Sequence, residues 1–227
     1  MDQADALRQQ SLHNWVMQGA SSTPLRSCLL SGGASRRMGQ DKALLPHPEG
    51  GSWLARTLRL LAELRAPITL LSRWPEHLAL AAQLAKEFTA APAPGDRSPT
   101  AITALAEPSP WEGPLLALHR LMEAHPNQRL LLCPVDMPDL TLSVLKSLLA
   151  AAEAAPGAIH LAHDGARLQP LLGLYPSAPS IRAHLAESLG RGERQLQRWL
   201  AGVSYQPVLL DPQALRNVNR PVAHEAP

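Results

Sequence analysis

The sequence contains very little cysteine and no long uninterrupted run of apolar residues. Its 227 residues include only two cysteines, Cys28 and Cys133, and each lies inside a short apolar stretch. Two such thiols do not suffice for a disulfide framework or a cysteine-rich metal site, and they indicate buried thiols in a reducing compartment. No stretch reaches the roughly 18 apolar residues of a membrane span, and the polar N-terminal region differs from a secretory signal. We therefore expect a cytoplasmic protein without a membrane segment.

The chain also lacks a strong excess of charge of either sign. Its formal net charge is +2 at pH 7, and it has no long basic run. We therefore expect no nucleic-acid partner, whereas a site for anionic small molecules remains open. With 45% hydrophobic residues the chain is long enough to bury one substantial core. We expect an N-terminal extension over residues 1–24 and a single domain over residues 25–227.

Short apolar runs alternate with helical patterns along the chain. Continuous apolar runs that end at turn or charged residues predict strands at Leu25–Ser31, Ile68–Ser72 and Arg129–Val135. Apolar residues spaced three and four apart predict helices over residues 52–65, 75–88, 113–125 and 141–155. Later strands are expected over residues 158–165 and 168–176, joined by a turn at Asp164–Arg167, and over residues 205–210.

This alternation predicts an α/β fold with three layers, in which a doubly wound, mostly parallel sheet carries helices on both faces. Ligands of such sheets bind beyond the carboxyl ends of the strands, which makes the residues after Leu30 and Val135 candidates for a site. The proline-rich residues 89–113 contain no recognisable element. Because a loop of this length is typically a binding loop or a mobile one, we expect residues 89–112 to be mobile.

Both of the familiar nucleotide-binding fingerprints are missing. The stretch LLSGGASRRMGQDKALL, residues 29–45, has neither the Gly-Lys-Ser/Thr of a P-loop nor the G-x-G-x-x-G of a dinucleotide site. Its adjacent Gly32 and Gly33 would still let the main chain approach a ligand closely, while two arginines and Lys42 supply positive charge for phosphates. On composition alone, a flexible glycine-rich turn with solvated cations explains the stretch equally well.

Residues 30–45 resemble the signature L-A-G-G-x-S/A-x-R-M-G-x-D-K of nucleotidyltransferases that activate small phosphorylated metabolites. Within that group they are most similar to the molybdenum cofactor guanylyltransferases, because two arginines precede Met38. Further segments are similar to this family in the same order: EGPLLAL, LLLCPVDMPDL, HDGARLQPLLGLY and LRNVNRP. The resemblance covers nearly the whole chain after residue 25. It implies a Rossmann-like nucleotide-diphospho-sugar transferase fold.

The resemblance implies a Mg²⁺-dependent transfer of GMP from GTP onto the terminal phosphate of molybdenum-loaded molybdopterin, with release of pyrophosphate. It also implies transient contacts with molybdopterin-loading proteins and with apo-molybdoenzymes. In this reaction a phosphate oxygen attacks the α-phosphorus of a highly anionic triphosphate. Catalysis then consists mainly of neutralising charge and holding two anions together.

The resemblance assigns the catalytic roles to three side chains. Asp136 follows a buried strand and is expected to bind Mg²⁺, although an aspartate of a turn ahead of Pro138 is the alternative. Lys42 is expected to pair with the triphosphate and the departing pyrophosphate, unless it is a solvated lysine at a helix start. Arg37 is expected to face the second, pterin-bearing phosphate.

The nucleotide contacts implied by the resemblance are the backbone groups of Leu30, Ser31, Gly32 and Gly33, together with Gly113 of the EGPLLAL segment. Family members commonly carry an aspartate shortly before this segment. The ungapped position here is Ala106, with Glu107 beside it, so either Glu107 takes that role or the contact is absent.

The NVN segment, residues 217–219, is expected to bind the acceptor, molybdenum-loaded molybdopterin. Asn217 and Asn219 alternate by two, so in an extended chain both amides point to one face and can orient the pterin or its phosphate. The alternative is a turn ahead of Pro221, where asparagine is common.

Two other functions remain open at the level of the sequence. A relative with the same fold could use CTP or another nucleotide, or an acceptor such as a sugar or polyol phosphate, because a few hydrogen bonds decide the base. A catalytically inactive carrier that delivers finished cofactor is the second alternative, favoured by the changed acidic position at Ala106. The presence of both Lys42 and Asp136 argues against a pure carrier.

Overall fold

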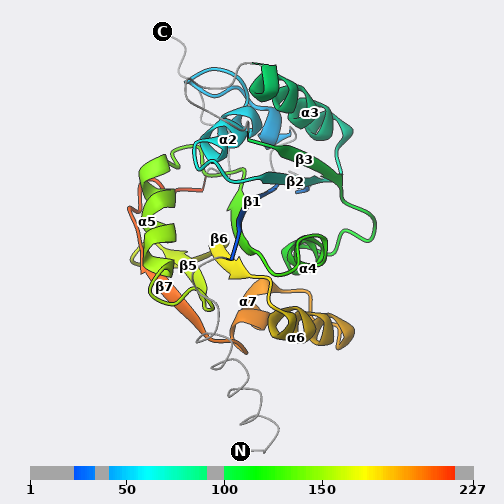
Figure 1. Cartoon of the computed structure of the whole chain (residues 1–227), viewed down its shortest axis with the longest axis vertical. Helices are drawn as coiled ribbons and strands as arrows, with labels where there is room; N and C mark the ends of the chain where they lie inside the picture. The colour runs from blue at the N-terminus through cyan, green and yellow to red at the C-terminus, as the bar shows by residue number, and fades with distance from the viewer. Residues whose placement is uncertain (1–22, 34–40, 91–99, 218–227) are drawn as a thin grey trace, which may run out of the picture.

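The structure, a computed structural model, describes residues 23–33, 41–90 and 100–217. Within them one sheet has the strand order β3-β2-β1-β4-β6-β5-β7 (Figure 1). The strands are β1 (Leu25–Leu30), β2 (Ile68–Ser72), β3 (Ile102–Ala106), β4 (Arg129–Pro134), β5 (Ile159–His163), β6 (Leu168–Pro176) and β7 (Tyr205–Leu209). The helices are η1 (Lys42–Leu44), α2 (Trp53–Ala62), α3 (Pro75–Ala90), α4 (Pro114–Ala124), α5 (Leu142–Ala152), α6 (Pro179–Gly190) and α7 (Leu196–Leu200).

The sheet is mixed but mostly parallel, as the sequence predicts. β1 pairs in parallel with β2 and β4, β2 pairs in parallel with β3, and β5 pairs in parallel with β7. β6 runs antiparallel to both β4 and β5. The predicted β5–β6 hairpin is confirmed, and the Asp164 carboxylate closes its turn by accepting from the N–H groups of Ala166 and Arg167 at 2.8 and 2.7 Å.

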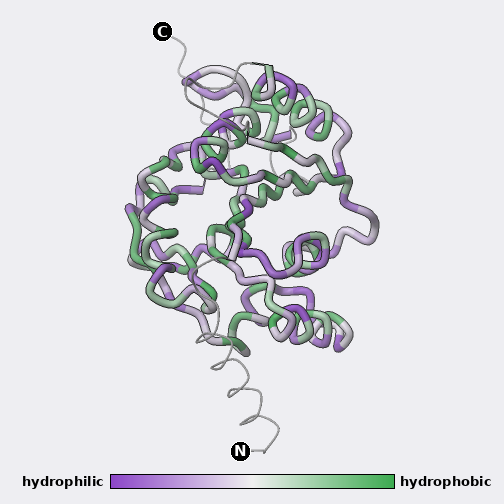
Figure 2. Tube along the Cα trace, in the orientation of Figure 1, coloured by the Kyte–Doolittle hydropathy of each residue, from purple (hydrophilic) through white to green (hydrophobic). Residues whose placement is uncertain are grey.

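The sheet separates two apolar cores, which makes the molecule a three-layer α/β structure. On one face α2, α3 and α5 pack around strand residues such as Leu29 and Leu131. On the other face α4, α6 and α7 cover strand residues such as Cys28 and Leu130, whose side chains alternate with the first set. Figure 1 shows α5 and α4 on opposite sides of the central strands, and Figure 2 shows hydrophobic residues concentrated along those strands.

Local signals in the sequence set the beginnings of three helices. Ser52 caps α2 by accepting from the Ala55 N–H at 3.2 Å, and Thr141 caps α5 by accepting from the Val144 N–H at 3.4 Å. Pro114 occupies the first turn of α4, where no intrahelical N–H bond is needed. The predicted helices are therefore confirmed.

The interpretation of residues 89–113 as an irregular loop is wrong in part. Residues 102–106 form β3, which extends the sheet beyond β2. The strand escapes recognition because it is short and lies at the edge, where its side chains alternate between partly buried and exposed. The structure also contains α6 and α7, for which the sequence analysis predicted no element.

Both cysteines are buried and free, as expected. Leu29 of β1 lies opposite Cys133 of β4, and Cys28 lies opposite Leu132, so the two thiols belong to cores on opposite faces of the sheet. This arrangement excludes a disulfide between them. Within the described ranges, no helix combines the length and the apolarity that crossing a membrane requires.

Candidate active site

A cavity of about 440 Å³ opens at the carboxyl ends of the parallel strands. Its walls come from the segments that follow β1, β2, β3 and β4, together with the start of α4 and one residue of β6. The predicted site residues that line it are Leu30, Ser31, Gly32, Gly33, Lys42, Glu107, Gly113 and Asp136. The structure therefore brings together eight residues that the sequence analysis singled out, in the place where parallel sheets bind ligands.

The loop after β1 passes close to a carboxylate. A Cβ atom on Gly32 would lie 2.6 Å from Oε2 of Glu107, whereas a Cβ atom on Gly33 would meet nothing within 4 Å. The loop is also held to the sheet, because the Ser31 N–H donates to the Leu71 carbonyl at 3.2 Å. Gly32 thus permits Glu107 to reach the wall of the cavity.

Glu107 extends β3 by one residue and turns its carboxylate into the cavity wall. Its N–H donates to the Ser72 carbonyl at 2.8 Å, which fixes the backbone beside β2. Its Oε1 accepts from Nη1 of Arg120 at 3.1 Å, and only 8% of the side chain is exposed. A paired, largely buried carboxylate of fixed orientation can accept hydrogen bonds from a ligand in the cavity.

Lys42 and Asp136 form an ion pair in the wall of the cavity. The Lys42 ammonium lies 3.9 Å from Oδ2 of Asp136, and the side chains are 14% and 29% exposed. Burial raises the pKa of the Asp136 carboxyl above its ordinary value, and the positive charge of Lys42 opposes this rise. A second cation at this carboxylate would favour its charged form further.

Asp136 is the candidate metal ligand, and the chemistry of the site fits Mg²⁺. Among the described residues there is no cluster of three or more His, Cys, Asp or Glu side chains that could enclose a metal ion. Mg²⁺ is usually held by one or two carboxylates together with substrate phosphates, so a single aspartate at the cavity is sufficient if a triphosphate binds there. The absence of a preformed cage does not conflict with this role.

The structure adds residues that sequence reasoning missed. Arg73, directly after β2, lines the cavity, and its guanidinium lies over the rings of Trp74 and Trp111 at 4.7 and 4.9 Å from their centroids. Trp111 also borders the cavity, with 53% of its surface exposed. The rule that directed attention to Leu30 and Val135 applies equally to the end of β2, and it would have identified Arg73.

A buried histidine was missed as well. His77, in the first turn of α3, contacts Ser31, Ser72 and Asp41 through its two ring nitrogens. Ser31 and Asp41 line the cavity, whereas His77 lies behind them. Nothing in the local sequence distinguishes this histidine from any other helix residue, because Ser31 and Asp41 come from distant segments.

Asn217 lies beside the cavity rather than in its wall. Its side chain donates to Oε1 of Gln169 in β6 at 3.1 Å. The preceding Arg216 pairs with Asp139 at 2.8 Å, in the segment that follows β4. These contacts place Arg216 and Asn217 next to β6, the strand that contributes Leu171 to the cavity. Arg36, Arg37 and Asn219 lie outside the described residues.

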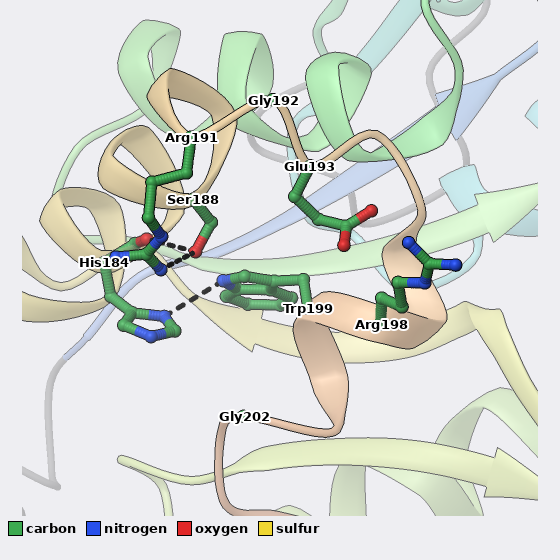
Figure 3. A pocket seen from close by; sticks show the side chains of 8 residues that line it. All are labelled: His184, Ser188, Arg191, Gly192, Glu193, Arg198, Trp199 and Gly202. Atoms are coloured by element: carbon green, nitrogen blue, oxygen red, sulfur yellow. Dashed lines mark hydrogen bonds between the residues drawn. The ribbon is translucent and has the colours of Figure 1, made fainter.

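A second hollow, of about 330 Å³, is formed by α6, α7 and their connection (Figure 3). It shares no lining residue with the first cavity. Trp199 donates its indole N–H to His184 at 3.0 Å, and Arg191 binds Glu187 at 2.7 Å and Ser188 at 3.2 Å. Because His184, Trp199, Ser188 and Arg191 already bond protein groups, these side chains offer a ligand less than the cavity at the sheet does.

Comparison with known proteins identifies relatives along most of the chain. The chain is 38% identical over 216 residues to a probable molybdenum cofactor guanylyltransferase from Rhodopirellula baltica, covering 91% of this chain and 92% of that protein. Its fold is similar to that of a molybdopterin-guanine dinucleotide biosynthesis protein A from Archaeoglobus fulgidus, with a TM-score of 0.58, 16% identity and coverage of 86% and 93% of the two chains. It is also similar to a Mycobacterium tuberculosis protein solved in complex with manganese, with a TM-score of 0.51, 15% identity and coverage of 83% and 89%.

The residues that match a known family model include those that form the cavity. The model of the MobA-like NTP transferase domain matches residues 27–208, a range that extends from β1 through β7. The segments of the cavity wall lie within this range. The resemblance deduced from the sequence is therefore confirmed: the chain belongs to the family of MobA-like NTP transferase domains, and its fold is that of the nucleotidyltransferases.

Proposed function

We propose that this protein transfers GMP from GTP onto the terminal phosphate of molybdenum-loaded molybdopterin and releases pyrophosphate. The observation that carries the proposal is the cavity in which the glycine loop, Lys42, Glu107 and Asp136 meet. The relatives are named for the guanine nucleotide and the molybdenum cofactor, which supports these two substrates. The family supplies nucleotidyl transfer as the reaction class.

The reaction requires the protein mainly to control charge. An oxygen of the acceptor phosphate forms a bond to the α-phosphorus of GTP, and the bond from that phosphorus to the bridging oxygen of pyrophosphate breaks. The attacking and leaving groups are both anions, so their approach has to be compensated by cations. Lys42 and Arg73 line the cavity and provide two such charges.

Lys42 and Asp136 have complementary tasks in this proposal. The Lys42 ammonium binds the β- and γ-phosphates and stabilises the charge that develops on pyrophosphate as it leaves. Asp136 holds Mg²⁺, which would neutralise phosphate charge and orient the triphosphate when bound. Arg37 would face the pterin-bearing phosphate, as the family resemblance implies.

Glu107 is proposed to select guanine. The Watson–Crick edge of guanine presents two adjacent donors, the N1–H and the 2-amino group, which match the two oxygens of a carboxylate. Cytosine and adenine present one amino donor beside a ring acceptor, which a carboxylate repels. Arg120 orients the carboxylate of Glu107 at the cavity wall, and the missing side chain of Gly32 leaves room for it.

The acceptor is proposed to bind on the side of β6. Asn217 is bonded to Gln169 there, and the neighbouring Arg216 pairs with Asp139 in the segment after β4 that also contains Asp136. Asn217 and Asn219 would orient the pterin or its phosphate by amide hydrogen bonds. This arrangement leaves the glycine loop and Glu107 to the nucleotide.

Calorimetric titration with GTP, CTP and ATP in Mg²⁺ tests the nucleotide assignment. We expect the wild type to prefer GTP and Asp136→Ala to bind GTP–Mg²⁺ about tenfold or more weakly, since a ligand of the metal is lost. Asp211→Ala is the matched control, because the carboxylate of this exposed aspartate bonds a local N–H group, that of Gln213 at 2.9 Å, and does not line the cavity. A preference for CTP would replace guanylyl by cytidylyl transfer. Tight binding of finished cofactor without any pyrophosphate release would support a carrier instead.

A further inference from the structure

A chain of buried hydrogen bonds runs behind the cavity from β1 to the turn that carries Lys42. Nδ1 of His77 lies 2.9 Å from Oγ of Ser31 and 3.0 Å from Oγ of Ser72. Nε2 of the same ring lies 2.6 Å from Oδ2 of Asp41. His77, Ser31 and Ser72 are almost completely buried. The imidazole therefore joins the ends of β1 and β2 to the segment around Asp41.

The chemistry of these groups fixes the direction of one hydrogen bond. An ionised carboxylate only accepts, so Nε2 of His77 carries a hydrogen and donates it to Asp41. As an acceptor Nδ1 has one lone pair, which can accept from the Ser31 hydroxyl at 2.9 Å, while the Ser72 oxygen lies 3.0 Å away and uses its own hydrogen elsewhere. Ser72 donates to the Ser31 carbonyl at 3.2 Å and accepts from the Trp74 N–H at 3.1 Å, which fixes this hydroxyl on β2 as well. The imidazole is thus oriented from one side and directs its N–H to Asp41 on the other.

Asp41 connects the His77 ring to the turn that carries Lys42. It is the N-cap residue of η1, and its Oδ1 accepts from the Ala43 N–H at 3.0 Å. Its carbonyl accepts from the Leu44 N–H at 3.2 Å, which closes the turn. Lys42 is the first residue of η1, with its ammonium 3.9 Å from Asp136. One carboxylate therefore binds the buried ring with one oxygen and the turn of Lys42 with the other.

A short turn needs such an anchor. η1 has only three residues, so its own hydrogen bonds cannot hold it in one conformation. A charged hydrogen bond that is buried on one side loses little strength to water and is specific in direction. The contact between His77 and Asp41 is therefore well suited to define where the Lys42 backbone lies.

We propose that His77 is a positioning residue of the nucleotidyl transfer site, which fixes the turn of Lys42 through Asp41. This inference rests on the proposed function, in which Lys42 binds the triphosphate and the departing pyrophosphate. His77 touches no substrate itself. It keeps the ammonium of Lys42 at the distance from the phosphates at which charge neutralisation is strongest.

Two substitutions separate the contacts of the ring. His77→Asn places an amide where Nδ1 lies and can still bond the serine hydroxyls, but it does not reach Asp41. His77→Gln extends to the position of Nε2 and can donate to Asp41. His160→Asn is the control for loss of a buried histidine, since His160 is 1% exposed in β5 and bonds the Ala158 carbonyl at 3.0 Å. Neither His77 nor His160 lines the cavity.

Hydrogen exchange tests whether His77 fixes the turn of Lys42, and this measurement does not require an active enzyme. In His77→Asn we expect the Ala43 amide to exchange about 10- to 100-fold faster than in wild type, the change that corresponds to loss of one charged hydrogen bond. His77→Gln and His160→Asn should remain near the wild-type rate. If the Ala43 amide is unprotected in wild type, or is equally protected in His77→Asn, the proposal is overturned.

Steady-state kinetics test whether the contact between His77 and Asp41 matters for GMP transfer. His77→Asn should lower kcat for GMP transfer by about tenfold and change KM for GTP less, because a displaced Lys42 stabilises the leaving pyrophosphate less. His77→Gln should restore most of the rate. In the Lys42→Ala background, His77→Asn should cause no further loss, since the histidine acts through the lysine. Full additivity of the two losses would refute the proposal. A wild type that transfers no GMP would instead refute the proposed function, and the exchange rates would still decide the role of His77.

Discussion

Gly32 shows how the absence of one side chain shapes the site. The Oε2 atom of Glu107 lies only 2.6 Å from the place where a Cβ atom of residue 32 would be, which is too close for both atoms. Adjacent glycines looked equivalent in the sequence, since either could bring the main chain near a ligand. The structure separates them, because only Gly32 has a neighbour at this position.

This difference gives a prediction with an internal control. Gly32→Ala should push the Glu107 carboxylate away from the cavity wall and weaken GTP binding by about tenfold or more, if that carboxylate bonds guanine. Gly33→Ala should weaken it clearly less, since nothing lies within 4 Å of its Cβ position. Calorimetry on both variants measures the effect. Equal losses would mean that Glu107 is not the group that Gly32 accommodates for the base.

Individual residues were foreseen where a motif or a strand end pointed to them. Lys42 and Asp136 follow from the signature and from the end of β4, and both line the cavity. His77 could not be found in this way, because its role depends on Ser31 and Asp41, which lie far away in the sequence. A histidine in a helix has no local signal for such contacts.

At the scale of elements, the end of α4 contains a titratable contact with the sheet. His125, the C-cap residue of α4, lies with Nε2 2.9 Å from the Thr69 hydroxyl of β2. Nη1 of Arg26 also approaches that hydroxyl, at 3.3 Å, and can only donate to it. The hydroxyl can then donate its own hydrogen to a neutral imidazole.

Stability should therefore fall in mild acid. Burial, and to a lesser extent the charge of Arg26, lowers the pKa of His125 from 6.5 to about 4. The unfolded chain takes up this proton below pH 6.5 and the folded chain only near pH 4, so the contribution is complete above pH 6.5 and disappears as the pH falls toward 4. Thermal unfolding of wild type and His125→Gln across this window should show the smaller loss in the variant. Parallel curves would exclude His125 as the source.

Elements differ in how well the sequence predicted them. The central strands β1, β2 and β4 are buried on both faces and read as continuous apolar runs, so they were predicted. β3 lies at the sheet edge and α7 has only five residues, so their patterns were too short or too exposed to recognise. Tertiary pairing with β2, rather than local preference, decides the conformation of residues 102–106.

At the scale of the whole molecule, the sheet divides the interior into two cores, and each contains one cysteine. Burial raises the pKa of Cys28 to about 12 and that of Cys133 to about 12. Both thiols should therefore be inert toward a thiol reagent at pH 8 in the native protein, because the thiolate is the reacting species.

The labelling of Cys28 and Cys133 therefore measures the unfolding of the two cores in one experiment. In increasing urea, Cys28 and Cys133 should become reactive in one common transition, if the two cores unfold together. Mass spectrometry of the labelled peptides distinguishes the two positions. Separate transitions would show that one helical layer opens before the other, and rapid labelling without urea would contradict their burial.

The doubly wound sheet was predictable because its strands and helices alternate regularly, whereas the contacts within the site depend on the three-dimensional structure. Alternating strands and helices predict the doubly wound sheet, and the sheet predicts the edge at which the cavity lies. Contacts such as those of Arg73 with Trp111, or of Glu107 with Arg120, depend on the meeting of loops that no periodicity describes. The division into an extension over residues 1–24 and a domain over residues 25–227 stays a prediction.

The most direct test of the proposed activity follows the transferred group itself. Wild type and Asp136→Ala are mixed with Mg²⁺, molybdenum-loaded molybdopterin and GTP labelled at the α-phosphate, and both pyrophosphate and the labelled dinucleotide are measured. We predict that wild type forms the two products in equal amounts and that Asp136→Ala forms them at least about 100-fold more slowly, as for removal of a group that stabilises charge in the transition state. Absence of labelled dinucleotide with wild type, or equal rates in the two proteins, would contradict guanylyl transfer at this site.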